Sequence, residues 1–308
     1  TLTAASTTTV LTSTAHGLAV GQALLCGTRG DAKGNGEVRS IIAADADTIT
    51  LNMALSGAPN SGSDTAVVST TVPLDEDATQ QYIDLLAIGF DATSGKEDQV
   101  QAIGCMGPIS FKGLGPQDVP TIDFSLVVGD WREVSVAGAV ATKDTTTALS
   151  GNPPAGTLGI GGFFIGDASA SNIARAVQKV SDVSINPNIA YEPLQDYNGV
   201  NGVGGFQKVP ASPTIEFTTL WSEDMPGLYN DWATYASSTT DVGKQIMLQL
   251  GHVATRCAAI ELQNCWLDGN PTRATMGALQ GVKVKMHCDE GLVTTNDLTR
   301  AALRCHFF

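Results

Sequence analysis

Polar and apolar residues alternate along most of the chain, in short runs that are separated by turn-forming residues. Near the N-terminus the runs are rich in Thr and Val, as in 7–11 and 47–51, and Gly, Asn and Asp residues divide them. Further runs of this kind lie at 245–250, 257–266, 281–288 and 298–308. Alternation with a period of two turns one side of each segment to a core and the other side to water. The pattern therefore predicts a mainly β protein whose C-terminal residues lie inside a sheet.

Two segments have the spacing of a helix instead. Residues 78–88 follow the carboxylates of 75–77, which complement the positive end of a helix dipole. Residues 224–235 begin with a hydrogen-bond acceptor and an early proline, and then carry a stripe of Leu228, Trp232 and Tyr235. We expect both segments to be helices that flank the sheets, and we interpret the aromatic stripe as core packing.

An internal repeat divides the chain. The sequence VPTIDFSL at 119–126 recurs as SPTIEFTT at 212–219, about 93 residues further on. Each copy follows a strand-like segment and a Gly-rich loop, and this shared order favours two copies of one fold over a chance match. The sequence therefore predicts a small N-terminal β module at 1–71, a first repeat at 72–180 and a second repeat at 181–308.

Alternation also assigns the two faces of the repeated strands. The acids Asp123 and Glu216 occupy equivalent positions on the face that we expect to meet water. The opposite face is expected to lie in the core of each repeat, and it comprises Ile122, Phe124, Ile215 and Phe217.

The charge of the chain excludes one class of function. The 308 residues include 17 Lys and Arg against 31 Asp and Glu, which gives a formal net charge of −14. A protein this acidic repels nucleic acid phosphates unless a basic patch intervenes, and the sequence has no such patch. Charged residues make up 16% of the chain, against roughly 25% in a typical soluble domain. This composition excludes a protein that grips DNA, and it indicates surfaces that are buried against copies of the same chain.

Candidate chemistry is sparse, and we expect neither an enzyme nor a cofactor. No Gly-x-Ser-x-Gly motif and no familiar set of His, acid and nucleophile occurs, so no catalytic residue is assigned. Alternation sends His287 and Cys288 to opposite faces of a strand, and likewise Cys305 and His306, which disfavours a metal site. His16 has no nucleophile near it and is interpreted as a turn or packing residue. The six cysteines are widely spaced without a Cys-x-x-Cys pair, so we expect buried free thiols.

The Gly-rich stretch at 199–205 could suggest a phosphate loop. However, an extended segment follows it rather than the start of a helix, and its glycine spacing fits neither phosphate-binding motif. We expect a long flexible hairpin or loop that reaches a neighbouring chain. Its candidate contact residues are Asn198, Gly199, Asn201, Gly202, Gly204 and Gly205.

Two parts of the chain resemble bacteriophage tail proteins. The segment STAHGLAVGQ at 13–22 resembles a small β module that recurs in such proteins. The Pro-Thr-Ile strands, the segment 224–235 and the closing strands resemble the major tail tube proteins of long-tailed bacteriophages, particularly those with a duplicated tube fold. This family implies β-sandwich units with a flanking helix, whose sheets join into a ring-forming β-barrel around a channel. In the duplicated branch three chains form a homotrimeric ring, and rings stack through long loops into a tube.

The same resemblance implies partners and location. It implies contacts with other tail proteins at the tube ends and with a tape-measure protein in the channel, while DNA passes through without specific binding. The expected location is the virion tail, after assembly in the host cytoplasm. No run approaches the roughly 18 apolar residues of a membrane helix, so no membrane is expected. Asp123 and Glu216 are candidates to line the channel, with an outer-surface or inter-subunit location as the alternative. We expect the N-terminal module to decorate the outside, so that its deletion leaves thinner tubes.

Other functions stay open at this point. One is another virion protein, such as a tail terminator or a capsid decoration protein. A second is a β-rich receptor-binding tail module, which would carry exposed pockets lined by aromatic residues. A third is a glycan hydrolase built on a β scaffold. Aromatic residues are only 6% of the chain, which does not favour the receptor-binding module.

Overall fold

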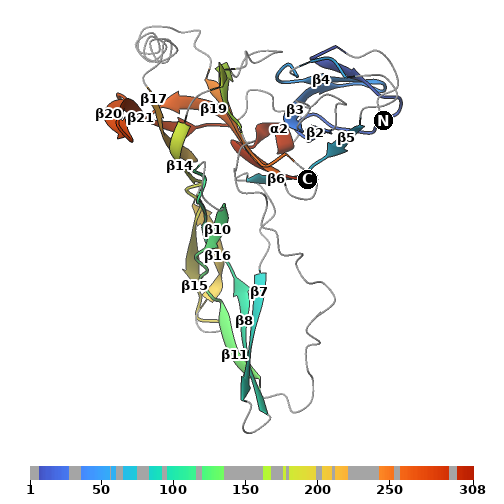
Figure 1. The fold of residues 1–308 in the computed structure, drawn as a ribbon. Coiled ribbons are helices and arrows are strands. Elements are labelled where there is room, and N and C mark those ends of the chain that lie inside the picture. Colours follow the sequence, from blue (N-terminus) through green and yellow to red (C-terminus); the bar gives the residue numbers. More distant parts are fainter. Residues whose placement is uncertain are drawn as a thin grey trace.

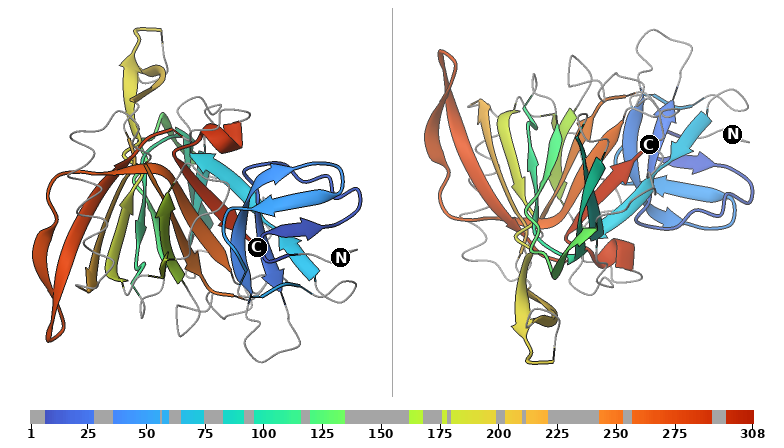
Figure 2. Two further views of the ribbon diagram at one scale, coloured as in Figure 1. Left: turned by 90° about the horizontal axis from the view of Figure 1, so that it is seen from above. Right: turned by 90° about the horizontal axis from the view of Figure 1, so that it is seen from below.

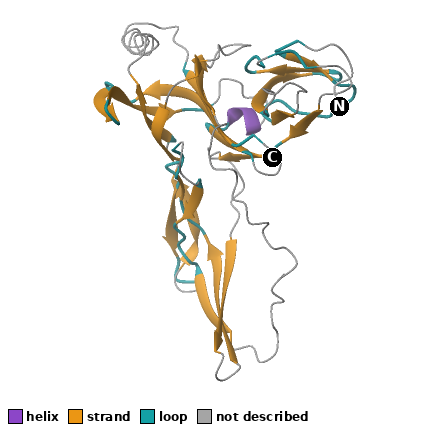
Figure 3. Ribbon diagram, viewed as in Figure 1, coloured by secondary structure: helices purple, strands orange, loops and turns teal. Residues whose placement is uncertain are grey.

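The structure is a computed structural model. It describes residues 7–27, 36–55, 57–59, 65–74, 83–91, 96–115, 120–134, 162–167, 176–177, 180–198, 203–209, 212–220, 243–252, 257–290 and 297–308. Strands dominate these residues, and a short helix, α2 (Asp297–Arg300), precedes the last strand (Figure 3). The protein is therefore mainly β, as its alternating pattern predicts.

A five-stranded antiparallel sheet forms the N-terminal module. Its strands are β1 (Val10–Thr12), β2 (Ala23–Gly27), β3 (Glu37–Ala44), β4 (Thr48–Leu51) and β5 (Thr65–Val68), in the order β1-β4-β3-β2-β5. Leu11, Ile41 and Leu51 are buried, and they belong to a core cluster made by strands of this module. The turn after β1 is held by His16, whose Nδ1 accepts the Leu18 N–H at 3.0 Å. His16 is thus a turn residue, as expected.

A twelve-stranded antiparallel sheet forms the body of the molecule and curls around its own core (Figures 1 and 2). Along its main path the strands are β10 (Thr121–Phe124), β9 (Ile109–Lys112), β14 (Val180–Asn186), β17 (Thr214–Leu220), β21 (Leu279–Cys288), β19 (Ala258–Leu267), β18 (Lys244–Leu250), β12 (Gly162–Asp167) and β13 (Ala176–Val177). Off this path, β20 (Thr272–Met276) pairs with β21, while β22 (Leu303–Phe307) pairs with both β19 and β6 (Thr70–Leu74). The C-terminus is therefore tied into the sheet, as expected.

Two smaller sheets extend away from this body (Figure 1). One contains β11 (Asp130–Val134), β8 (Lys96–Cys105) and β7 (Ile83–Asp91), in that order. The other is the hairpin of β15 (Ala190–Gln195) and β16 (Val203–Val209), which projects beyond the neighbouring strands in both views of Figure 2. A long hairpin therefore stands where the sequence predicts one.

The prediction of a helix at 78–88 is wrong for residues 83–88, which the structure describes. Residues from Ile83 onward belong to β7, which pairs with β8 from Ile83↔Cys105 to Asp91↔Lys96. The backbone hydrogen bonds of this ladder outweigh the local helix propensity of a segment that includes Leu85, Leu86 and Ala87. The second predicted helix, at 224–235, lies outside the described residues.

The two predicted repeats share one sheet. β9, β10 and β12 come from 72–180, yet they join strands from 181–308, and β14 runs across the boundary between the two ranges. A single core cluster likewise combines Phe111 and Phe163 with Phe217 and Val284. Neither repeat could bury its apolar face alone, because each contributes only part of the sheet.

Candidate functional site

The two Pro-Thr-Ile strands occupy equivalent places in the large sheet. In β10, Asp123 lies opposite Ser110 and Ile122 lies opposite Phe111 of β9. In β17, Glu216 lies opposite Ser184 and Ile215 lies opposite Ile185 of β14. The acid faces a serine and the isoleucine faces a large apolar residue in both copies, so the repeat in the sequence is also a repeat of strand register.

The copies meet through β9 and β14. These strands are antiparallel, and Phe111 lies directly opposite Ile185, its equivalent in the other copy. Equivalent residues that face each other across an antiparallel pair are related by a local two-fold axis, as in an isologous interface. The order β10-β9-β14-β17 is therefore a nearly symmetric unit with β10 at one outer edge.

The expected core residues differ between the copies. Ile215 and Phe217 are 0% and 1% exposed, and the Phe217 ring lies 4.8 Å from that of Phe163. Ile122 and Phe124 are 40% and 57% exposed, so the expectation that they lie in the core is wrong for this chain. The reason is position, because β17 has a strand on each side whereas β10 ends the described path of the sheet.

Asp123 and Glu216 lie on the outer face of the sheet, and both are paired. Asp123 forms an ion pair with Lys112, and Glu216 Oε1 lies 2.5 Å from Lys283 Nζ. All four side chains are substantially exposed, so each pair is worth at most about 1 kcal/mol. The acids therefore belong to a face on which lysines balance their charge.

The β15–β16 hairpin carries the candidate contact loop. Asn198 N–H donates to Asp196 Oδ1 at 2.9 Å, and a side chain at Gly204 would collide with Asp196 because its Cβ would lie 2.6 Å from that of Asp196. Tyr197 is fully exposed and Leu194 is 48% exposed. The hairpin thus presents apolar side chains to solvent near its tip. Three of the candidate loop residues, Gly199, Asn201 and Gly202, lie outside the described residues, and Gly205 lies in β16.

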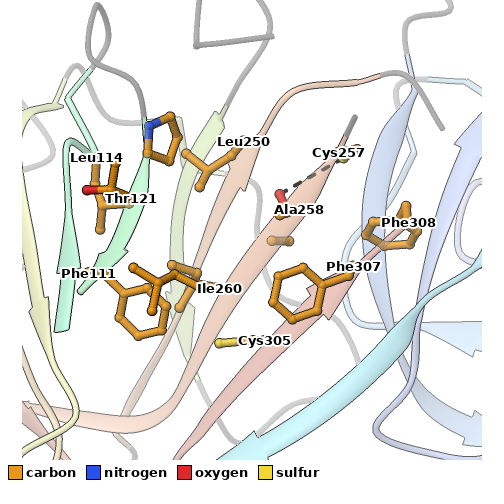
Figure 4. A pocket seen from close by; sticks show the side chains of 13 residues that line it. Phe111, Leu114, Thr121, Leu250, Cys257, Ala258, Ile260, Cys305, Phe307 and Phe308 are labelled. Carbon is orange, nitrogen blue, oxygen red and sulfur yellow. Dashed lines mark hydrogen bonds between the residues drawn. The ribbon is translucent and has the colours of Figure 1, made fainter. Parts of the chain in front are cut away.

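An apolar cavity of about 370 Å³ opens between β9–β10 and β19–β22. Figure 4 shows the side chains around it, among them Phe111, Ile260, Phe307 and Phe308, and Ile122 also lines it. Among the described residues that line it, Thr121 supplies the hydroxyl group and the others are apolar or cysteine side chains. A sugar or phosphate needs several hydrogen-bond partners, so this cavity does not favour a glycan hydrolase or a carbohydrate receptor.

A buried charge network joins the N-terminal module to the body. Its centre is Glu261 of β19, whose side chain is 0% exposed. The Glu261 Oε1 atom lies 2.8 Å from Arg304 Nη2, and Oε2 accepts the Ser40 hydroxyl at 2.6 Å. Among the described residues, the donors to the carboxylate are Ser40, Gln245, Gln263, Arg304 and His306. The charge is thus matched by one guanidinium, and both oxygens are satisfied, as burial requires.

Burial and the neighbouring groups together set the pKa values of Glu261 and His306. Burial alone would raise the pKa of the Glu261 carboxyl, but Arg304, His306 and Ser40 outweigh it and hold this pKa at about 2. Burial lowers the pKa of His306 below its usual value, so its ring is neutral at pH 7. The neutral ring donates from Nε2 to Glu261 at 3.1 Å, while Nδ1 accepts from the Thr71 hydroxyl at 3.0 Å.

This network is structural rather than catalytic. All described donors point at a carboxylate that solvent does not reach, so no substrate can contact it. Across the described part of the chain, no three His, Cys, Asp or Glu side chains lie close enough to share a metal ion. Sequence reasoning missed the network because Ser40 and Glu261 are 221 positions apart. The available signal was Glu261 itself, a carboxylate within the apolar run 257–266.

Comparison with known proteins finds no relative of this chain. No protein-family model matches the chain, and no curated protein matches it either. Among the described residues, no helix has the length and apolar character needed to cross a bilayer. The geometry therefore defines only a class, a mainly β protein with a curled antiparallel sheet, a projecting hairpin, and exposed apolar side chains on β10, the strand that ends the described path of the sheet.

Proposed function

We propose that this chain is a structural virion protein that assembles into stacked rings and forms the tail tube of a bacteriophage, a channel for DNA ejection. One observation carries the proposal: Ile122 and Phe124 are exposed on β10, which is the terminal strand of the large antiparallel sheet in the part of the chain that the structure describes. An open edge with exposed apolar side chains is a template for pairing with another chain. Closing such edges into a ring removes them.

Two further features support self-assembly. The exposed Leu194 and Tyr197 of the β15–β16 hairpin suit contacts with a chain in the next ring. The net charge of −14 disfavours tight binding of DNA inside a channel. The lysine partners of Asp123 and Glu216 weaken the case for these two acids as the source of that repulsion.

The local two-fold axis bears on how chains enter a ring. Successive units around a ring carry equivalent strands in the same direction, whereas β9 and β14 of one chain run in opposite directions. This supports counting the whole chain as the unit that repeats around the ring. A homotrimeric ring remains our prediction for the number of chains.

The test is electron microscopy of the purified full chain by negative stain. We expect hollow tubes of regular diameter; single rings that do not polymerise would indicate a terminator instead, and monodisperse monomers would contradict the proposal.

A matched pair of variants tests the open edge. Phe124→Lys places a charge on the edge of β10, where it should oppose strand addition and reduce tube formation at least tenfold. Leu279→Lys is the control, because Leu279 is 59% exposed but lies in the β20–β21 hairpin. Equal loss of tubes in both variants would assign the effect to added charge and count against the edge.

A further inference from the structure

Two cysteines of neighbouring strands face each other in the core of the large sheet. Cys265 of β19 lies directly opposite Cys288 of β21 in the strand register. Their Sγ atoms are 3.0 Å apart, and the two residues are 1% and 0% exposed. Both residues are free thiols in this structure.

The backbone geometry at this pair suits a covalent link. Cys288 N–H donates to Pro213 O on its other side at 2.8 Å, so its polar backbone groups point away from Cys265. The neighbouring residues do bond across the two strands, since Asp289 N–H donates to Asn264 O at 3.2 Å. Cys265 and Cys288 therefore form a non-hydrogen-bonded pair, the type in which opposite Cα atoms are only about 4.5 Å apart. That separation lies within the range of disulfides, and bond formation requires the sulfurs to approach by about 1 Å.

We propose that Cys265 and Cys288 form an oxidative modification site, at which a peroxide links β19 to β21 through a disulfide. A thiolate of the pair attacks one oxygen of hydrogen peroxide, the O–O bond breaks, and a sulfenic acid forms, while the hydroxide that leaves takes up the proton lost by the thiol and becomes water. The second thiol attacks the sulfenic sulfur, the S–S bond forms, and the S–O bond breaks with release of water. In total two thiols lose two electrons and two protons, and the peroxide is reduced to two molecules of water. This inference does not depend on the proposed function.

The surroundings of Cys265 and Cys288 determine how fast the disulfide forms and which cysteines form it. Both sulfurs are buried, so peroxide reaches them only when the sheet opens locally. Burial and the adjacent Cys288 thiol also raise the pKa of Cys265 well above its usual value, so the thiolate is scarce and the reaction in the folded chain is slow. A sulfenic acid formed here nevertheless meets a second sulfur at once. Cys305 is also buried, and burial raises its pKa to about 12, but its register partners are Ile260 and Val72. Cys305 therefore lacks a sulfur directly opposite it in the sheet.

The experiment treats the reduced full chain with dilute hydrogen peroxide, denatures it, alkylates the remaining thiols and maps the peptides by mass spectrometry. We expect a single linked species that has lost two hydrogens and joins Cys265 to Cys288, with the other four cysteines alkylated. Methionine sulfoxide in the same sample shows that the oxidant was active. Links that involve Cys257 or Cys305, or methionine oxidation without any link, would overturn the proposal.

Matched variants sharpen the test. Cys265→Ala should abolish the link and leave Cys288 alkylated or further oxidised, whereas Cys305→Ala should form the link as the wild type does. A link in Cys265→Ala that involves Cys288 and another cysteine would contradict the assignment. The wild-type peptide map decides the question even if a variant fails to fold.

Discussion

Glu261 links the five-stranded N-terminal sheet to the twelve-stranded sheet. Its carboxylate is fully buried and accepts hydrogen bonds from both sheets, including the Ser40 hydroxyl and the Arg304 guanidinium. A buried pair of this kind adds little net stability compared with apolar packing, but its disruption is costly because one charge remains without a counterion. Glu261 and Arg304 are register partners within the twelve-stranded sheet, and the Ser40 hydroxyl ties the N-terminal sheet to this pair.

Substitution of Glu261 should lower the stability of the protein more than substitution of an exposed acid does. Glu261→Gln leaves the buried Arg304 charge uncompensated, so we expect a loss of about 3 kcal/mol in the free energy of unfolding, measured in urea. The control is Glu216→Gln, which removes the same charge from a half-exposed pair with Lys283 and should cost no more than about 1 kcal/mol. Equal losses in the two variants would show that the buried pair has no special role.

The same network predicts a loss of stability in acid. The pKa of His306 is below its usual 6.5 in the folded chain, so the unfolded chain binds its proton first and stability falls as the pH drops below about 6.5. The pKa of Glu261 is about 2, against its usual 4.5, so its contribution is present above pH 4.5 and is lost between pH 4.5 and 2.

Unfolding in urea at a series of pH values measures both steps. His306→Gln should keep a donor to Glu261 while removing the step that begins near pH 6.5, and should leave the step below pH 4.5 in place. A His306→Gln profile that coincides with the wild type down to pH 5 would contradict this assignment.

At the scale of elements, the β15–β16 hairpin is an addition to the sheet rather than part of it. Its strands pair only with each other in the described structure, and the register begins at Ala190↔Val209. Most residues of β15 are exposed, whereas Phe206 of β16 is buried. A feature of this kind costs little stability to remove, and its exposed apolar residues suit an intermolecular contact.

Shortening the hairpin tests that contact. Replacing residues 191–208 with Asn-Gly joins Ala190 to Val209 through a two-residue turn that matches the twist of antiparallel strands. The monomer should stay folded, with a urea midpoint lowered by no more than the loss of the buried Phe206 side chain accounts for. If the proposed tube is correct, electron microscopy should show rings or short stacks in place of long tubes. Tubes of normal length would show that the hairpin does not join the rings.

At the scale of the molecule, the N-terminal module shares its core with the body. Leu25, Val38 and Met53 of the module pack with Phe164 and Met247 of the large sheet. Val38 N–H also donates to the Gln249 side chain at 3.0 Å. The sequence-based expectation of an outer decoration that can be deleted without harm conflicts with this shared core, because deletion would expose the apolar partners to water.

Deletion of residues 1–69 tests whether the stability of the body depends on the N-terminal module. Each large apolar side chain that becomes exposed costs roughly 1.5–3 kcal/mol, and Glu261 also loses the Ser40 hydroxyl. We expect the truncated chain to be insoluble or to unfold at a much lower urea concentration than the full chain. A soluble truncated chain with the wild-type urea midpoint would show that the two parts fold independently.

Much of the fold was predictable from the sequence, whereas the important contacts were not. Alternation located β17, β18, β19 and β21, because each strand is buried on at least one face and its own residues record that burial. The helix expected at 78–88 failed because the ladder with β8 overrode a local spacing. Ile122 and Phe124 have the same pattern as Ile215 and Phe217, and only their place at the sheet edge distinguishes them.

The sequence by itself determined the β class, the repeat and the turns, since period-two alternation and turn residues act over a few neighbouring positions. The tertiary structure decided which residues meet. Cys265 and Cys288 are 23 positions apart, and Ser40 and Glu261 are 221 apart. Such pairs depend on the order and register of strands from distant parts of the chain, and register follows from the packing of a whole sheet rather than from any local pattern.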